Sequence, residues 1–198
     1  MDVGAYQWAK LGDYAWIDAN GNGLQDPNEA PLPDVTAEVY RASDDTLVGS
    51  TTTGPSGHWE VGGLAPGTYY VIFTLPTGYV FTAANQGFDD TMDSDADPAT
   101  GRTGNYTLSS GQFNQTVDVG AYQWAKLGDY AWIDANGNGL QDPNEAPLPD
   151  VTAEVYRASD DTLVGSTTTG PSGHWEVGGL APDRRRCPSH RRNPGWRT

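Results

Sequence analysis

Residues 11–29, with the sequence LGDYAWIDANGNGLQDPNE, join a strand pattern to a metal-binding pattern. The first seven residues mix aromatic and aliphatic side chains, as β-strands do. The next twelve fit the calcium-loop pattern D-x-[DN]-x-[DN]-G-x5-E at every specified position. Pro31 and Pro33 follow, and proline denies a helix its backbone donors. These residues therefore predict an EF-hand-like loop set in a β protein, without the flanking helices of an EF-hand.

Six residues of the loop are predicted calcium ligands, because Ca²⁺ takes about six to eight oxygen ligands and this spacing supplies them. In order, they are Asp18, Asn20, Asn22, Leu24 (through its carbonyl), Asp26 and Glu29. Gly23 occupies the position where the loop turns sharply. The loop recurs with Asp134, Asn136, Asn138, Leu140, Asp142 and Glu145. A plain turn is the alternative, since Asn, Gly and Asp favour turns, but a turn needs neither of the last two acidic residues.

Composition limits the class of protein. The 198 residues carry 26 acidic and 11 basic side chains, for a net charge of −15. So acidic a chain repels nucleic acid and anionic membranes, and we expect neither as a partner. The 25 Gly, 14 Pro, 7 Trp and 10 Tyr fit a turn-rich, all-β protein. Cys187 is the single cysteine, so no intrachain disulfide can form. We find no signal peptide and no apolar run of membrane-spanning length.

A long internal repeat sets the domain organisation. Residues 2–66 recur without a change as residues 118–182, a period of 116 residues that corresponds to a whole domain. The chain is therefore interpreted as an excerpt from a tandem array. Its predicted parts are the last strand and linker of an upstream repeat (1–9), a complete repeat (10–122), a truncated second repeat (123–182) and an unrelated basic tail (183–198).

The truncated repeat lacks the sequence that follows Pro66 in the complete one, so we expect it to expose half of a core face. The tail contains six Arg and one Asp. Its abrupt change in composition suggests a frameshift or a gene-model error. A basic arm for nucleic acid or membranes is the weaker interpretation, because the tail is short and has little aromatic content.

Seven or eight strands are predicted in the complete repeat. They lie at 11–17, 35–40, 47–53, 58–61, 68–75, 79–82, 105–108 and 116–119. Residues 68–75 are nearly all apolar or aromatic, as in a central strand. Short strands at this spacing, separated by turn signals, predict a sandwich of two antiparallel sheets.

A second acidic loop, at residues 87–98, interrupts the regular spacing of short strands and turns. Its carboxylates repel one another unless a cation lies among them. Asp93, Asp95 and Asp97 alternate, so they face the same way if the segment is extended. The candidate ligands of further calcium ions are Asp89, Asp90, Asp93, Asp95 and Asp97. A mobile acidic loop is the alternative interpretation.

Several motifs of the complete repeat resemble those of one known family. They are LGDYAW at 11–16, the calcium loop, TGPSGH at 53–58, LAPGTY at 64–69, DSD at 93–95 and VDVG at 117–120. With them, residues 11–122 resemble the B repeats of the serine-aspartate-repeat cell-wall adhesins, relatives of the collagen-adhesin B-type domains. The resemblance implies an immunoglobulin-like sandwich, several structural calcium ions and an extracellular position on the bacterial surface or cell wall. It supplies neither a ligand nor a catalytic residue.

We therefore expect a calcium-binding spacer repeat and not an enzyme. Its expected partners are neighbouring repeats of the same chain, joined by the short aromatic linker 122–126. The alternative is a module that binds a host protein or a glycan through exposed aromatic residues or the acidic loop. Related domains form a Lys–Asn isopeptide bond beside an acid, but here Lys10 would meet Phe73 at the acid's position, so no such bond is expected. His58 is interpreted as a structural or exposed strand histidine.

Overall fold

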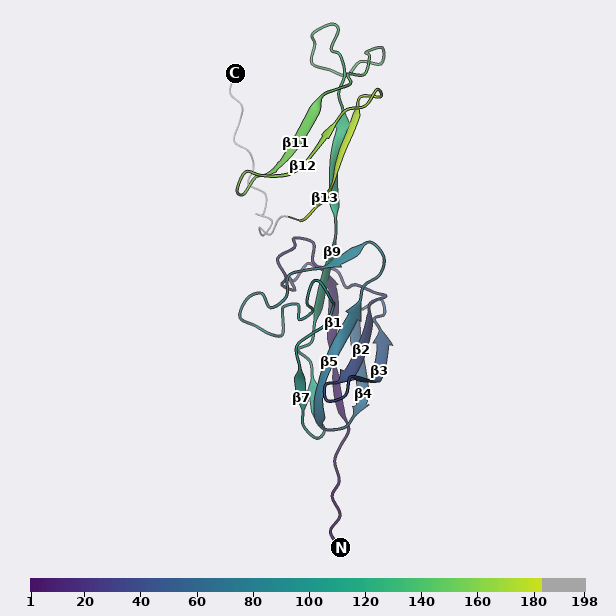
Figure 1. The fold of residues 1–198 in the computed structure, drawn as a ribbon, viewed down its shortest axis with the longest axis vertical. Helices are drawn as coiled ribbons and strands as arrows, with labels where there is room; N and C mark the ends of the chain where they lie inside the picture. Colours follow the sequence, from purple (N-terminus) through teal and green to yellow (C-terminus); the bar gives the residue numbers. More distant parts are fainter. Residues whose placement is uncertain (183–198) are drawn as a thin grey trace. The chain divides into compact units, whose positions relative to one another are not determined.

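The computed structural model describes residues 1–182, in which every regular element is a β-strand. The strands are β1 (Ala9–Ile17), β2 (Thr36–Arg41), β3 (Thr46–Thr52), β4 (His58–Leu64), β5 (Gly67–Thr74), β6 (Tyr79–Phe81), β7 (Tyr106–Leu108), β8 (Phe113–Asn114), β9 (Val119–Gln123), β10 (Ala125–Tyr130), β11 (Thr152–Arg157), β12 (Thr162–Thr168) and β13 (His174–Leu180). They are shown in sequence colours in Figure 1. The predicted basic tail, residues 183–198, lies outside the described residues.

Two compact units divide the described chain, Met1–Gln123 and Trp124–Ala181, called unit 1 and unit 2 below. Unit 1 contains β1 to β9, and unit 2 contains β10 to β13. A single residue, Trp124, separates β9 from β10 in the sequence.

Unit 1 is the immunoglobulin-like β-sandwich that the strand spacing predicts. One sheet has the order β4-β1-β9-β6, with β8 also paired to β1, and the other has the order β3-β2-β5-β7. Alternate residues of the strands point inward, as in Thr36–Arg41, where Ala37 and Val39 are fully buried. Trp59 of one sheet packs edge-on against Phe73 of the other, with 5.3 Å between ring centroids.

Two strands of this sandwich run parallel to their neighbour, whereas its other strand pairs are antiparallel. β8 pairs with β1 at Lys10 and Leu11, and β9 pairs with it at Ala15, Trp16 and Ile17. β8 and β9 thus follow the same edge of β1, one after the other. The chain enters β1 at one end of the sheet and leaves β9 at the opposite end.

Unit 2 repeats only half of this architecture. β10 pairs with β13 in the register of β1 with β4, and β11 pairs with β12 in the register of β2 with β3. Leu11 and Leu32 are buried in unit 1, but the identical Leu127 and Leu148 are 50% and 37% exposed. The truncated repeat therefore exposes its core face, as its sequence predicts.

Candidate metal centre

The first calcium-loop sequence forms a compact bend directly after β1. Gly23 has a positive φ of 80°, and a Cβ there would collide with the backbone oxygen of Ala83. Only glycine therefore fits at this point of the loop. Leu24 forms an isolated antiparallel bridge with Asp93, and the N–H of Gln25 donates to the carbonyl of Met92 at 2.7 Å. The two acidic loops, distant in sequence, thus lie side by side.

Three predicted ligands of this loop converge through their side chains. The Nδ2 groups of Asn20 and Asn22 donate to the same oxygen, Oδ2 of Asp26, at 2.8 and 2.9 Å. Both amide side chains therefore already point at one carboxylate. Rotation about χ2 would turn each amide oxygen toward the same place, which suits a cation bound by oxygen atoms.

The other two side-chain ligands brace the loop ends. Asp18 is fully buried, and its carboxylate accepts hydrogen bonds from the N–H groups of Asn22 and Gly23 and from the hydroxyl of Thr82. Glu29 accepts from the N–H groups of Ala19 and Asp26, at 2.8 and 3.1 Å. Burial raises the pKa of Glu29, and the nearby Asp18 carboxylate adds to the rise. The loop therefore concentrates negative charge at its centre.

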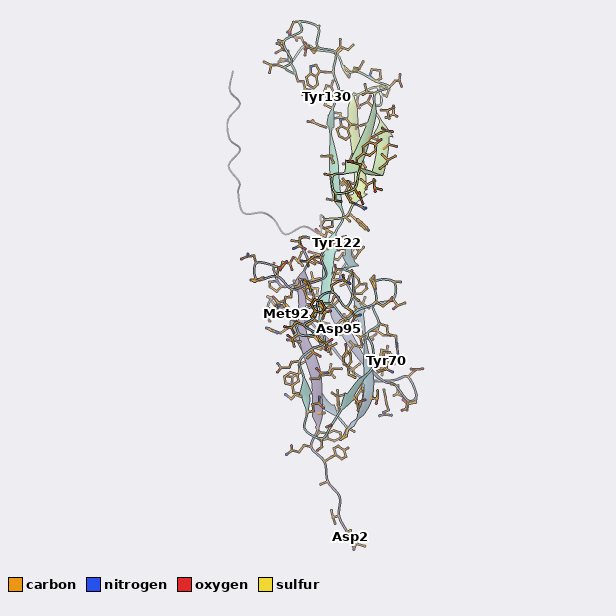
Figure 2. All side chains as sticks on the ribbon, turned by 90° about the vertical axis from the view of Figure 1, so that its left-hand side faces the viewer. Asp2, Tyr70, Met92, Asp95, Tyr122 and Tyr130 are labelled. Carbon is orange, nitrogen blue, oxygen red and sulfur yellow. The ribbon has the colours of Figure 1, made fainter. Side chains whose placement is uncertain are left out.

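The second acidic loop places two of its predicted ligands inside the fold. Asp93 and Asp95 are 6% and 7% exposed, and Figure 2 shows Asp95 within unit 1, near Met92 of the same loop. Asp95 accepts from the backbone N–H of Asp118 at 2.7 Å and from the hydroxyl of Tyr106 at 2.8 Å. One oxygen of Asp93, Oδ1, is buried without a hydrogen-bond partner.

The remaining aspartates of this loop lie apart. Asp89 and Asp97 are exposed and accept hydrogen bonds within their own turns, from Thr91 and Thr100 respectively. These bonds lower the pKa of both carboxyl groups. Asp90 is also exposed. Asp97 does not share the buried surroundings of Asp93 and Asp95, because the chain turns at 97–101 instead of staying extended.

Sequence reasoning missed Asp118, which lies close to Asp93 and Asp95. These three buried aspartates are called the acidic cluster below. It is fully buried in the gap between β8 and β9, where its Oδ1 accepts from the N–H of Tyr14 at 3.0 Å. Its Oδ2 has no hydrogen-bond partner. The available signal was an acidic residue next to the apolar Val117 and Val119 in a closing-strand pattern.

Burial dominates the electrostatics of the cluster. It raises the pKa of Asp118 to about 9, and the carboxylates of Asp13 and Asp95 add to the rise. The pKa of Asp95 rises to about 7 for the same first reason, against hydrogen bonds from Asp118 and Tyr106 that lower it. A neighbouring positive charge would favour the ionised form of both carboxyl groups.

Replacing Asp118 with asparagine tests this picture. In chelator, we expect Asp118→Asn to raise the free energy of unfolding by about 1–2 kcal/mol, because an amide of the same shape places no ionisable group beside the carboxylates of Asp13 and Asp95. Asp2→Asn is the matched control, since Asp2 occupies the same repeat position but is exposed. Urea unfolding of the 198-residue chain measures both, and a loss of stability in Asp118→Asn would contradict the expectation.

The second copy of the loop keeps its internal hydrogen bonds but not its surroundings. Asn136 and Asn138 again donate to Oδ2 of Asp142, at 2.7 and 2.9 Å, and Glu145 again accepts from Ala135. Asp134, however, is exposed, whereas Asp18 is fully buried. Unit 2 therefore has the loop without the second acidic loop that packs against it in unit 1.

The other residues considered from the sequence have structural roles. Trp16 and Trp59 are buried in the core. Nδ1 of His58 lies 3.3 Å from the carbonyl oxygen of Asp13 at an exposed strand position. Lys10 forms an exposed ion pair with Glu60 at 2.7 Å, and Phe73 is buried.

Two further observations concern residues 1–182 as a whole. Within this range, no three His, Cys, Asp or Glu side chains gather closely enough to hold a metal ion by themselves. Any cation held here would need the amide and carbonyl oxygens of the loop as well. The same range contains no helix with the length and apolarity to cross a membrane.

The two-sheet sandwich, its bracing loops and its exact internal repeat define a structural β-sandwich repeat. The chain belongs to the SdrD B-like domain family, whose model matches residues 9–121 and again 125–187. Family membership makes it a structural β-sandwich repeat that is located outside the cell.

Curated relatives agree with this assignment. The chain is 36% identical over 183 residues to serine-aspartate repeat-containing protein F of Staphylococcus epidermidis, covering 91% of the chain and 11% of the relative. It is 36% identical over 172 residues to serine-aspartate repeat-containing protein C of Staphylococcus aureus, covering 86% of the chain and 17% of the relative. The chain thus spans less than a fifth of the length of these relatives.

Among solved structures, the Bacillus anthracis TIE protein aligns with a TM-score of 0.43 and 17% identity, over 87% of this chain and 27% of that one. A Streptococcal ancillary pilin aligns with a TM-score of 0.40 and 15% identity, over 88% of this chain and 50% of that one.

Proposed function

We propose that the complete repeat binds calcium where its two acidic loops meet, and that the bound ions stiffen an extracellular spacer. The observation that carries this proposal is a pair of buried carboxylate oxygens without partners, Oδ1 of Asp93 and Oδ2 of Asp118. A buried acceptor left unpaired costs about 1–3 kcal/mol, and more when it is charged. A divalent cation in the acidic cluster would offset that cost and the repulsion between carboxylates.

The donor set suits calcium better than a transition metal. It consists of carboxylate, amide and carbonyl oxygens, with no cysteine and no histidine in either acidic loop. Hard cations prefer such ligands, and calcium tolerates the irregular geometry of a mixed set. In the first loop, Asp18, Asn20, Asn22, Leu24, Asp26 and Glu29 would hold the ion. In the second loop, Asp93 and Asp95 are the better placed candidates, because Asp89, Asp90 and Asp97 are exposed.

The mechanical role follows from where these loops attach. The first loop continues from β1, the second contacts it through Leu24 and Asp93, and the N–H of Asp95 donates to the carbonyl of Asp118 just before β9. An ion between the loops would therefore tie the end of the first strand to the last one. Extracellular modules bind calcium at roughly 10⁻⁴ to 10⁻³ M, so occupancy would follow external calcium.

Calcium removal tests the proposal. We expect chelation to lower the melting temperature of the complete repeat by roughly 5–10 °C, because a ligand that binds only the folded state stabilises it by mass action. Protease cutting within 18–29 and 87–98 should increase as well. Scanning calorimetry and limited proteolysis of the 198-residue chain measure both effects.

The repeat supplies a matched pair of control variants. Glu29→Gln should remove much of the calcium-dependent rise in melting temperature, whereas Glu145→Gln, at the same position in unit 2, should preserve it. Identical melting curves with and without calcium in the unsubstituted chain would refute the proposal.

A role in binding a host protein or a glycan remains the second candidate. The burial of Trp16 and Trp59 removes both core tryptophans of the complete repeat from any sugar-binding platform. Phe88 and Met92 of the acidic loop are exposed, so they are the apolar groups that such a ligand would meet. We prefer the spacer function because the buried, unpartnered oxygens of Asp93 and Asp118 favour a bound cation, whereas they give no reason to expect a host ligand.

A further inference from the structure

We propose that the second copy of the calcium-loop sequence, residues 134–145 in unit 2, is a site of spontaneous deamidation at Asn136 and Asn138. The packing of unit 1 protects the identical Asn22 from the same reaction. Deamidation replaces the side-chain amide of asparagine with a carboxyl group, and asparagine counts among the chemically labile residues. The reaction itself needs no metal ion, whereas its effect on calcium ligands rests on the proposed function.

The sequence of the loop favours this chemistry. Asn136 and Asn138 are each followed directly by a glycine. The attacking atom is the backbone nitrogen of the following residue, which must approach the side-chain carbonyl carbon of the asparagine. Glycine has no Cβ to obstruct that approach, and its backbone turns easily into the conformation that ring closure requires. Both asparagines of the loop therefore have a suitable neighbour.

Water and ammonia alone balance the reaction. The backbone nitrogen of Gly139 loses its proton to base and forms a bond to Cγ of Asn138. The side-chain nitrogen leaves as ammonia, taking up a proton, and a five-membered cyclic imide remains. Water then opens the imide at either of its two carbonyl carbons, which gives aspartate or isoaspartate. One water molecule is consumed and one ammonia is released, and nothing is oxidised or reduced.

The hydrogen bonds at Asn138 turn its side chain toward the peptide that attacks it. Oδ1 of Asn138 accepts from the N–H of Leu140 at 2.7 Å, so the side-chain carbonyl is directed along the following residues. The N–H of Gly139 donates to Oδ2 of Asp134 at 2.8 Å. This second bond must break before the nitrogen of Gly139 can attack. The cost of breaking it therefore decides how fast the imide forms.

In unit 2 that cost is low. Asp134, Asn138 and Gly139 are all exposed, and nothing lies within 4 Å of a Cβ added at Gly139. Water can therefore take the place of the carboxylate as the acceptor, and a hydrogen bond that water replaces contributes little. The backbone also has room to turn while the ring closes.

In unit 1 the same bond is buried. The N–H of Gly23 donates to Oδ2 of Asp18 at 2.8 Å, and Asp18 is fully buried. A Cβ added at Gly23 would collide with the backbone oxygen of Ala83, so the chain is tightly enclosed here. The carbonyl of Gly23 also accepts from the N–H of Ser94 at 3.2 Å. Ring closure at Asn22 would therefore break buried contacts that water cannot replace.

The difference in burial sets the size of the expected effect. Leaving a buried donor and acceptor unpaired costs more than exchanging an exposed pair for water. Because reaction rates depend exponentially on such costs, Asn138 should deamidate at least about tenfold faster than Asn22. The two asparagines have identical neighbours in the sequence, so the fold alone would produce this ratio.

Deamidation would change the ligands of the loop in unit 2. Oδ2 of Asp142 accepts from Nδ2 of Asn136 and of Asn138, at 2.7 and 2.9 Å. A carboxylate at either position would remove a donor and add repulsion, although it could still bind a cation. In isoaspartate the backbone is also longer by one methylene group. The two copies of one loop would thus become chemically different as the protein ages.

The experiment must distinguish two identical peptides. Trypsin cleaves after Lys and Arg, so it releases residues 11–41 and 127–157 with the same sequence. Thr152→Ser, at an exposed position, marks the second peptide by its mass. The 198-residue chain with this substitution is incubated in chelator at mildly alkaline pH, in heavy-oxygen water. Tandem mass spectrometry then counts the labelled aspartate and isoaspartate formed at each asparagine.

We expect faster labelling at Asn138 than at Asn22 by at least about tenfold in the folded chain, and equal labelling in urea. Gly139→Ala should slow the reaction at Asn138 and leave Asn136 unchanged. Equal rates at Asn22 and Asn138 in the folded chain, or a ratio that persists in urea, would overturn the inference. An unchanged rate at Asn138 in Gly139→Ala would do the same. Because chelator is present throughout, none of these results depends on calcium binding.

Discussion

Asp18→Ala should lower the free energy of unfolding of the complete repeat by about 3 kcal/mol or more, since three donors would lose their acceptor in a buried place. The donors are the N–H groups of Asn22 and Gly23 and the hydroxyl of Thr82. Asp18 is fully buried, so these donors are not in contact with bulk solvent that could replace the carboxylate. The loss should appear in chelator as well as in calcium.

The second copy of the loop provides the control for this variant. Asp134 accepts from the N–H groups of Gly137, Asn138 and Gly139, but it is exposed, so water can take its place. Asp134→Ala should therefore cost less than about 1 kcal/mol. Urea unfolding followed by near-UV circular dichroism compares the two variants, and equal losses would show that burial is not the cause.

Phe73→Ala should destabilise the sandwich by about 3–5 kcal/mol, the usual cost of removing a buried phenylalanine ring. Phe73 is 2% exposed on β5, and its ring meets Trp59 of the other sheet edge-on. The substitution would open a cavity between the two sheets. The melting temperature should fall by more than about 10 °C in scanning calorimetry.

An exposed phenylalanine separates this effect from a general loss of aromatic surface. Phe88, in the acidic loop, is fully exposed, so Phe88→Ala should change the free energy of unfolding by no more than about 0.5 kcal/mol. A small effect at Phe73 would mean that the two sheets do not share the tightly packed core described above.

The strands that local patterns identified correspond closely to those of unit 1. The alternation in 35–40 and the apolar run at 68–75 predicted β2 and β5, with strand ends that differ from the observed ones by one residue. Such strands can be predicted locally because the side chains of the strand itself determine which face is buried. The closing strand was predicted too early, at 116–119. Asn114 accepts from the N–H and hydroxyl of Thr116, and Asp118 bonds Tyr14, so the chain is irregular until Val119.

The loops show a similar division between local and tertiary information. Spacing alone singled out Asp18 to Glu29, and their hydrogen bonds with one another recur in both copies. It could not reveal that Asp118 lies beside Asp95, since 23 residues separate them and only the folded sheet brings them together. It also could not show that Asp93 and Asp95 are buried while Asp97 is exposed, because that depends on a turn at 97–101.

The parallel course of β1 and β9 has a consequence for a stalk under tension. Pulling the ends of the complete repeat apart would slide these adjacent strands along each other, so the hydrogen bonds between them would resist in shear and share the load. Antiparallel terminal strands would instead peel apart one bond at a time. A repeat that is pulled by its two neighbours in the chain would therefore gain resistance to stretching from this strand order alone.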